Sequence, residues 1–120
     1  MRQMSEVEAA YMGALVDGEG SVGVYTGMHP KKGHGRVTPL LMVMVCNSDP
    51  ELISACFRAT GTGGCHVRPP GTFKSGDGKW IFRWNIYGFK SLPFLHRIAP
   101  YSVKAQRGIF DLAMLYGAPV

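Results

Sequence analysis

The chain has 120 residues, of which 46% are hydrophobic and 18% are charged, a balance typical of a globular protein and not of a disordered one. No apolar run reaches the length of a membrane span, and Glu6 and Glu8 interrupt the first segment where a signal peptide needs an apolar stretch. We therefore expect one domain over residues 1–120, small enough that a second copy would help to bury a core. The formal net charge of +5 favours a polyanionic partner.

The three cysteines, Cys46, Cys56 and Cys65, are odd in number and have no C-x-x-C spacing. They predict reduced core thiols of an intracellular protein. Cys65-His66 offers half of a metal site, but the sequence supplies no second half.

The first predicted helix begins at Ser5, which forms an S-x-x-E capping box with Glu8, and ends at the glycines around Asp17 and Glu19. A helix C-terminus carries about half a negative charge, so a carboxylate there is disfavoured by a few tenths to about 1 kcal/mol. A hard divalent cation removes that repulsion, because carboxylates and backbone carbonyls such as that of Gly18 are ligands that Mg²⁺ prefers. The acids therefore indicate a site. The alternative is an ordinary helix with a glycine-rich C-cap.

Two small residues in this helix, Gly13 and Ala14, would let a second helix approach closely. Two such helices side by side would bring four carboxylates together. The repulsion among these carboxylates would be stronger than in one helix, so a cation between them would be needed even more.

The next segments alternate with a period of two and predict a strand at 21–28, a basic loop at 30–36 and a strand at 37–46. One face of the first strand is small or able to form hydrogen bonds, as a ligand face would be. The loop is either a solvated hairpin connection or a phosphate contact. The second strand is apolar on both faces, and the sequence leaves open whether the face of Thr38 and Met44 binds a ligand or is packed.

A second helix is predicted after Asp49, a good N-cap that is followed by Pro50, and it stops at Gly61. A third strand runs from Cys65 to about Pro69, with His66 and Arg68 on one face. A hairpin turn over 74–79 then leads to the clearest strand. The apolar face of this strand is predicted to pack in the core and consists of Trp80, Phe82, Trp84 and Ile86. The other face holds Lys79, Ile81, Arg83, Asn85 and Tyr87.

The chain then predicts a helix over about 89–98, a break at Pro100 and a last helix from the Ser102 cap to Leu115, with Lys104 and Arg107 in its first turns. The residues available for packing this helix are Val103, Ile109, Leu112, Ala113 and Tyr116. The whole order predicts an α+β protein in which two hairpins form one four-stranded antiparallel sheet, covered by helices on one face. The other, concave face is basic and suits a duplex groove.

Residues 12–20 resemble the nine-residue signature of the LAGLIDADG homing endonucleases, in the variant that ends Asp-Gly-acid-Gly. Gly13-Ala14 reverses the usual Ala-Gly order, and Glu19 stands where Asp is commoner. The family's αββαββα fold matches nearly the whole chain, the segment 64–68 resembles its third strand, and Lys104 lies where the family places an active-site basic residue.

The resemblance implies a homing endonuclease (meganuclease) of intron or intein mobility. With a single copy of the motif, the chain resembles the homodimeric branch of the family. This branch makes metal-dependent double-strand breaks with short 3′ overhangs at a long near-palindromic DNA target. It implies Mg²⁺ as cofactor, with Mn²⁺ or Ca²⁺ as substitutes, double-stranded DNA as partner, and neither a membrane nor a small-molecule substrate. The implied location is intracellular, in the cytoplasm or nucleoid of a bacterial or phage-infected cell, or in an organelle.

The resemblance also implies roles for residues. Glu19 would hold the ion with the Gly18 carbonyl, Lys104 would offset charge on the phosphate, and Asn47 would position solvent, although Asn47 suits turn chemistry equally well. The predicted dimer contacts are Ala10, Gly13, Ala14 and Asp17, the last through hydrogen bonds at the helix end. The predicted DNA-binding residues are Ser21, Tyr25, His29, Lys31, Lys32, Arg36, Thr38, His66, Arg68, Lys74, Lys79, Arg83 and Asn85.

Three alternatives stay open on the sequence. Arg83 and Lys79 would otherwise belong to a solvated sheet face, and Lys104 would be a surface lysine. The chain would otherwise be an RNA maturase or a DNA-binding protein of the same fold without cleavage, although Glu19 is intact. A basic α+β domain for some other partner would leave the two acids beside Gly18 unexplained.

Overall fold

The computed structural model describes residues 1–28, 37–71 and 78–120, and for residues 26–28 and 37–39 it describes the backbone only. The elements follow one another as α1 (Glu6–Glu19), β1 (Gly20–Met28), β2 (Val37–Asn47), α2 (Pro50–Thr60), β3 (Gly64–Arg68), β4 (Ile81–Tyr87), the 3₁₀ turn η2 (Gly88–Lys90), α3 (Ser91–Ile98), the 3₁₀ turn η3 (Ala99–Tyr101) and α4 (Val103–Tyr116).

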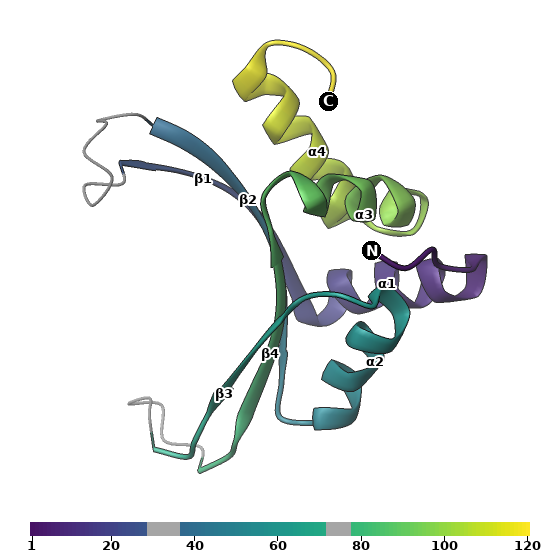
Figure 1. Cartoon of the computed structure of the whole chain (residues 1–120), viewed down its shortest axis with the longest axis vertical. Coiled ribbons are helices and arrows are strands. Elements are labelled where there is room, and N and C mark those ends of the chain that lie inside the picture. The colour runs from purple at the N-terminus through teal and green to yellow at the C-terminus, as the bar shows by residue number, and fades with distance from the viewer. Residues whose placement is uncertain (29–36, 72–77) are drawn as a thin grey trace.

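The strands form one antiparallel four-stranded sheet in the order β1-β2-β4-β3. The helices lie on one face of the sheet, which curves away from them, and the other face is left open (Figure 1). This arrangement confirms the predicted α+β class, with two hairpins joined in one sheet. No helix in the described ranges is long and apolar enough to span a bilayer.

The start of α1 is fixed by local chemistry. The Ser5 hydroxyl accepts from the Glu8 amide at 3.2 Å, and the Glu8 carboxylate accepts from the Ser5 amide at 3.0 Å, which is the predicted capping box. At the other end Gly20 has an extended backbone, so the chain passes from α1 directly into β1. A side chain at Gly20 would come within 2.9 Å of the Met44 carbonyl oxygen, and the glycine therefore lets α1 end against β2.

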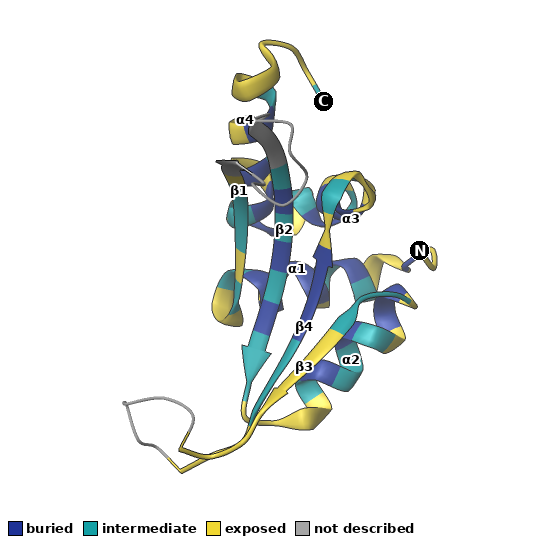
Figure 2. Cartoon of the chain, turned by 60° about the vertical axis from the view of Figure 1, so that its left-hand side comes forward, coloured by how far each residue is buried: buried dark blue, intermediate teal, exposed yellow. Residues whose placement is uncertain are grey.

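The core lies between the sheet and the helices. Trp84 and Ile86 of β4 are buried, and the Trp84 ring meets Phe94 of α3 edge to face with 5.6 Å between centroids. Burying a large apolar side chain contributes roughly 1.5–3 kcal/mol, so this layer supplies most of the fold's stability. Burial is concentrated in the central strands β2 and β4, whereas β3 is exposed after the half-buried Gly64 (Figure 2).

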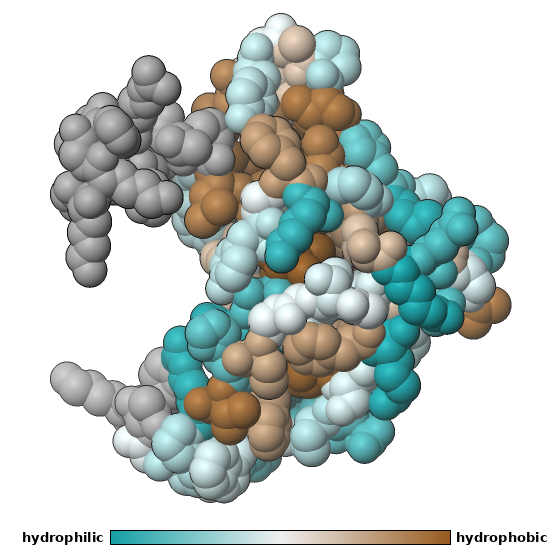
Figure 3. Space-filling model, in the orientation of Figure 1, coloured by the Kyte–Doolittle hydropathy of each residue, from teal (hydrophilic) through white to brown (hydrophobic). Residues whose placement is uncertain are grey.

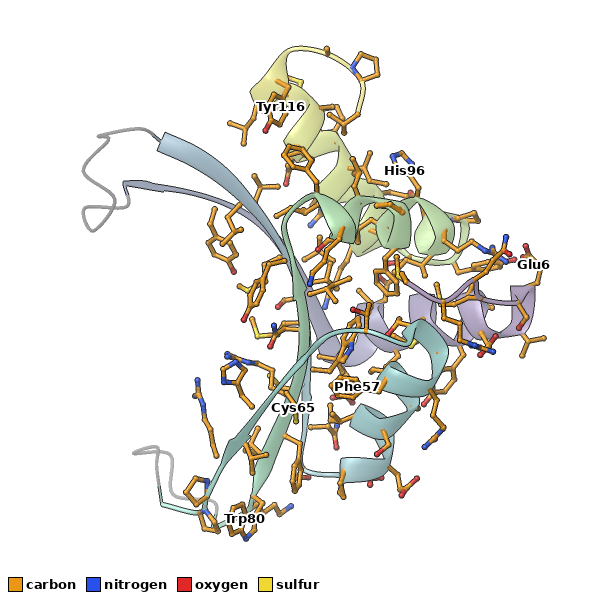
Figure 4. The ribbon with its side chains drawn as sticks, in the orientation of Figure 1. Glu6, Phe57, Cys65, Trp80, His96 and Tyr116 are labelled. Atoms are coloured by element: carbon orange, nitrogen blue, oxygen red, sulfur yellow. The ribbon has the colours of Figure 1, made fainter. Side chains whose placement is uncertain are left out.

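The structure corrects the predicted core at the start of β4 and at the ends of α4. Trp80 was expected in the core wall, but it is 52% exposed, because β4 begins at Ile81 and Trp80 lies beyond the helical layer (Figure 4). Val103, the first residue of α4, was expected among the residues that pack this helix, but it is 61% exposed. The buried face of α4 is the one on which Gly108 lies against Val22. Tyr116 is exposed as well.

The cysteines are free, as expected, but they do not all lie in the core. Cys56 of α2 is buried, and burial raises the pKa of its thiol to about 12, which makes it inert. Cys46 is half-buried, and Cys65 is exposed on β3 (Figure 4).

Candidate active site and nucleic-acid interface

The C-terminal end of α1 brings two predicted site residues together. Glu19 is the last residue of α1 and is exposed, and the Asn47 side-chain amide donates to its carboxylate at 3.2 Å. The Asn47 side-chain oxygen accepts from the Asp49 amide at 2.8 Å. Asn47 therefore serves the turn before α2, as one interpretation of the sequence expected, and also donates to Glu19. Its role in positioning solvent stays a prediction.

Lys104 reaches the same end of α1 from the first turn of α4. Its ammonium group donates to the Gly20 carbonyl oxygen at 2.7 Å. Gly20 directly follows Glu19, so the residues with predicted catalytic roles converge from α1, β2 and α4 on one point. Gly18 is exposed beside them.

Asp17 has a different environment from Glu19. Its carboxylate accepts from the Ser102 hydroxyl at 2.7 Å, from the Lys104 amide at 3.1 Å and from the Val103 amide at 3.0 Å. Desolvation by burial favours a higher pKa, but these hydrogen bonds outweigh it and hold the pKa of Asp17 below its usual value. The charge that looked misplaced at the end of α1 lies at the N-terminus of α4, where a carboxylate is favoured.

The predicted contact face of α1 needs one correction. Gly13 was expected to face a second helix of another chain, but it is buried against Tyr101 of its own chain, where an added Cβ would come within 2.7 Å of the Tyr101 Cβ. The Tyr101 hydroxyl donates to Glu6, so this tyrosine lies along α1 and covers one side of it. Glu6 marks the end of α1 that is remote from the sheet (Figure 4).

Another side of α1 is left uncovered. Val7 is 79% and Tyr11 44% exposed, and Ala14 and Gly18 continue the same stripe at helical spacing. We call Val7, Tyr11, Ala14 and Gly18 the α1 stripe. Ala10, which was predicted at the dimer contact, is half-buried beside it, and Asp17 is half-buried by its bonds to α4.

The uncovered face of the sheet is defined by the strand register. Residues that pair directly across antiparallel strands lie on the same face, and Trp84 and Ile86 point to the helices. The open face therefore consists of Ser21, Gly23, Tyr25, Leu40, Met42, Met44, Cys46, Gly64, His66, Arg68, Ile81, Arg83, Asn85 and Tyr87. The surface is hollowed on this side of the molecule (Figure 3).

The centre of the open face is apolar. Met42, Met44 and Cys46 of β2 are half-buried there, so this face of the strand is not packed under the helices. That it binds a ligand stays a prediction. Basic groups lie towards β3, where His66 is paired with Arg83 across the strands. A pocket of about 380 Å³ lies among them, lined by Met44, Cys46, Arg68, Ile81 and Arg83.

Asn85 departs from its predicted position as an exposed DNA contact. The register places it on the open face, opposite Met44 and Gly64, but it is only 1% exposed. Strand alternation predicts the face correctly and says nothing about whether neighbouring side chains cover the residue.

Of the remaining predicted DNA contacts, Arg83 is half-buried, and the others divide into two groups. Ser21, Tyr25, His66, Arg68 and Lys79 are exposed, and Lys79 precedes β4. His29, Lys31, Lys32, Arg36 and Lys74 lie outside the described residues, as does the side chain of Thr38.

Sequence reasoning missed the contact between Asp17 and the start of α4, and the Gly20 carbonyl as the acceptor for Lys104. One signal was available, because α4 has no acid in its own first turn and so leaves its N-terminal amides to an acid from elsewhere. Nothing in the local sequence says which acid this is.

One chain offers part of a metal site. In residues 1–28, 37–71 and 78–120 no three His, Cys, Asp or Glu side chains come together as a metal-binding group. Asp17 already accepts three hydrogen bonds, which leaves the Glu19 carboxylate and the nearby backbone carbonyls as donors. These are hard oxygen ligands, which fit Mg²⁺ or Ca²⁺ in kind, and the described residues place no further carboxylate or imidazole beside them.

Comparisons with known proteins gave matches among solved structures. No family model and no curated protein matches the chain. The homing endonuclease I-CvuI, solved in complex with its target in the presence of calcium, superposes with a TM-score of 0.67 at 17% identity, over 88% of this chain and 64% of its own. The chain has the LAGLIDADG homing-endonuclease fold.

Two further structures with this fold agree. An archaeal intron-encoded homing endonuclease complexed with DNA gives a TM-score of 0.59 at 15% identity, over 85% of this chain and 62% of its own. I-LtrWI, a LAGLIDADG homing endonuclease bound to target DNA, gives 0.61 at 21% identity, over 93% of this chain and 37% of its own. The chain thus spans less than two thirds of the length of each of these proteins.

Proposed function

We propose that this chain is a LAGLIDADG homing endonuclease that cuts double-stranded DNA at a specific site as a homodimer with a divalent cation. The observation that carries the proposal is the convergence of Glu19, Asn47 and Lys104 at the end of α1, where the chain passes into β1 of the sheet. An exposed carboxylate, a side-chain amide that holds it and a lysine ammonium group are what metal-assisted phosphodiester hydrolysis requires of a protein.

The open face supports DNA as the substrate. It is concave, and His66, Arg68 and Arg83 lie on it, in a chain with a formal charge of +5. Positive side chains supply the sequence-independent part of DNA binding, and side chains on the strands reach base edges. The named structural neighbours are themselves complexes with DNA.

The α1 stripe supports a homodimer. Val7 and Tyr11 expose apolar surface, and Ala14 and Gly18 let a second helix come close. A two-fold axis along this stripe would put the two Glu19 carboxylates near one another, each with its own Asn47 and Lys104. Such a dimer recognises a near-palindromic site, because each half of the DNA meets the same surface.

In the proposed mechanism, Glu19 and the Gly18 carbonyl would hold the cation, which supplies Lewis acidity and lowers the pKa of bound water. Asn47 acts as a positioning residue, since its amide fixes the Glu19 carboxylate. Lys104 is anchored by one hydrogen bond to Gly20 and keeps further N–H groups to neutralise charge that develops on the phosphate. Asp17 takes no part in the chemistry and joins α1 to α4.

The test is cleavage of a randomised duplex library by the protein with Mg²⁺, with an EDTA reaction beside it. We expect metal-dependent double-strand cuts with short 3′ overhangs at one near-palindromic sequence. If the protein selects a sequence but does not cut it, with or without Mg²⁺, the chain is a DNA-binding protein without nuclease activity. Selection of no sequence at all would overturn the DNA-directed function.

A further inference from the structure

Asn85 is a buried amide without a partner on the face that is proposed to meet DNA. Neither its side-chain oxygen nor its nitrogen has a hydrogen-bond partner among the described residues, although the side chain is 1% exposed. Gly64 leaves room for it, because a Cβ there would come within 3.2 Å of the Asn85 nitrogen. A buried polar group without a partner costs roughly 1–3 kcal/mol, so the residue requires an explanation.

Arg83 is the neighbour of this amide along the same face of β4. It precedes Asn85 by two residues on β4, so both are on the open face, and its guanidinium Nη1 contacts the Met44 sulfur at 3.8 Å. Met44 is directly opposite Asn85 on β2, so the Arg83 side chain runs from its own position towards the partner of Asn85. The Arg83 Nε is also buried without an acceptor in the described part of the chain.

The contact with Met44 is a weak one. A thioether sulfur is a poor acceptor, so the guanidinium group gives up little when it leaves for a base edge or a phosphate. The pocket lined by Met44, Cys46, Arg68, Ile81 and Arg83 opens beside it and provides room for this movement. Unsatisfied polar atoms of Asn85 and of Arg83 itself thus lie beside a guanidinium group that only a weak contact holds.

We propose that Arg83 and Asn85 act together as a reader of two purines in each half of the DNA target: Arg83 leaves Met44 to bind a guanine, and the uncovered Asn85 binds an adenine. The proposal rests on the DNA-binding function proposed above. Arginine pairs with guanine O6 and N7 through two hydrogen bonds, and asparagine pairs with adenine N6 and N7 in the same way. Both side chains would thereby gain partners for polar atoms that have none among the described residues.

The spacing of the two residues limits where their bases lie. Two residues along a strand span about 7 Å, because each residue rises by about 3.4 Å. Neighbouring base pairs are about 3.4 Å apart along the duplex, so the guanine and the adenine fall within two base pairs of one another. The reader therefore predicts a G·C and an A·T position that are specified together in each half-site.

The experiment is a binding selection from a randomised duplex library, with Ca²⁺ in place of Mg²⁺, for the wild type and three variants. Asn85→Leu should relax the A·T position alone, and Arg83→Met the G·C position alone, each by roughly 5- to 150-fold, which corresponds to the 1–3 kcal/mol of one bidentate pair. Met44→Leu is the matched control, because it removes the sulfur but neither reader, and it should keep both preferences.

A fourth variant, Asn85→Asp, keeps the size of the side chain and replaces the donor by an acceptor, so it should switch the A·T position towards cytosine. This result also separates base reading from a structural role, because a merely structural residue would not change the base that is selected. The proposal is overturned if Asn85→Leu and Asn85→Asp both select the wild-type sequence. If the wild-type protein selects no sequence, the DNA-binding function itself has failed, which is a different outcome.

Discussion

The Ser102 hydroxyl donates to the Asp17 carboxylate at 2.7 Å and so ties the start of α4 to the end of α1. The amides of Val103 and Lys104 donate to the same carboxylate. This link fixes Lys104 in register with Glu19, because the backbone of Lys104 is bonded to Asp17 and its ammonium group to Gly20. Asp17 thus joins α1 to α4, and Glu19 is left exposed for the chemistry proposed for it.

Asp17→Asn should destabilise the fold. The charged acceptor of three hydrogen bonds is replaced by a neutral amide, and hydrogen bonds to charged groups contribute about 1.5–3 kcal/mol each before compensation by the new side chain. We expect a loss of about 1–2 kcal/mol in the free energy of unfolding, measured by urea denaturation. Glu51→Gln, at an exposed acid of α2, is the matched control and should change it by less than about 0.5 kcal/mol. Equal effects of the two changes would contradict the role given to Asp17.

The same link makes stability depend on pH in the acid range. The pKa of Asp17 is lowered in the folded protein, so the unfolded chain binds more protons as the pH falls. The contribution is complete above the unfolded pKa of about 3.9 and is lost as the pH falls through the lower, folded pKa. The difference in unfolding free energy between wild type and Asp17→Asn should therefore be constant from about pH 5 to 7 and shrink towards pH 2. A difference that stays constant down to pH 2 would show that the carboxylate has no folded-state partner.

Gly13→Ala tests the packing of Tyr101 on α1. The added methyl group would lie 2.7 Å from the Tyr101 Cβ and 3.0 Å from its carbonyl oxygen, so η3 has to move. Overpacking of this kind costs about 1–3 kcal/mol, seen as a lower melting temperature. Gly18→Ala is the control on the same helix, because an added Cβ meets nothing of its own chain within 4 Å. Both variants are compared in the Ala14→Arg background, where the proposed contact between chains is removed. If Gly13→Ala is as stable as Gly18→Ala, the contact with Tyr101 is not as described.

Ala14→Arg tests the α1 stripe as a dimer contact. The residue is exposed, so the variant should fold as the wild type does, but two added positive charges would meet at the two-fold axis. We expect a dimer for the wild type and a monomer for the variant in sedimentation velocity. Gln3→Arg adds the same charge at an exposed position away from the stripe and should leave the dimer intact. A variant that still dimerises would exclude this face as the interface.

The sequence predicted what depends on neighbours along the chain. The capping boxes and caps at Ser5, Asp49 and Ser102 are local, and each helix begins where they indicate. The alternation of β4 placed Trp84 and Ile86 in the core, because strand geometry fixes the face of each residue.

The sequence failed where the outcome depends on distant residues. Gly13 looked like a contact between chains because nothing nearby indicates that Tyr101 covers it. Asp17 looked like an unfavourable charge because its partner Ser102 is 85 positions away. Asn85 was placed on the correct face, but its burial depends on residues of other strands, such as Met44 and Gly64 opposite it, and the alternation of β4 does not show them.

The central claim is tested most directly by the rate at which a duplex carrying the selected site is cut in Mg²⁺ by the wild type and by Glu19→Gln. The amide keeps the hydrogen-bonding shape of Glu19 but removes the negative ligand, and loss of even an outer ligand to a metal site lowers activity by about 10- to 100-fold. We predict that Glu19→Gln binds this duplex within a few-fold of the wild type and cuts it at least about 100-fold more slowly. Cleavage by Glu19→Gln at the wild-type rate would contradict the account.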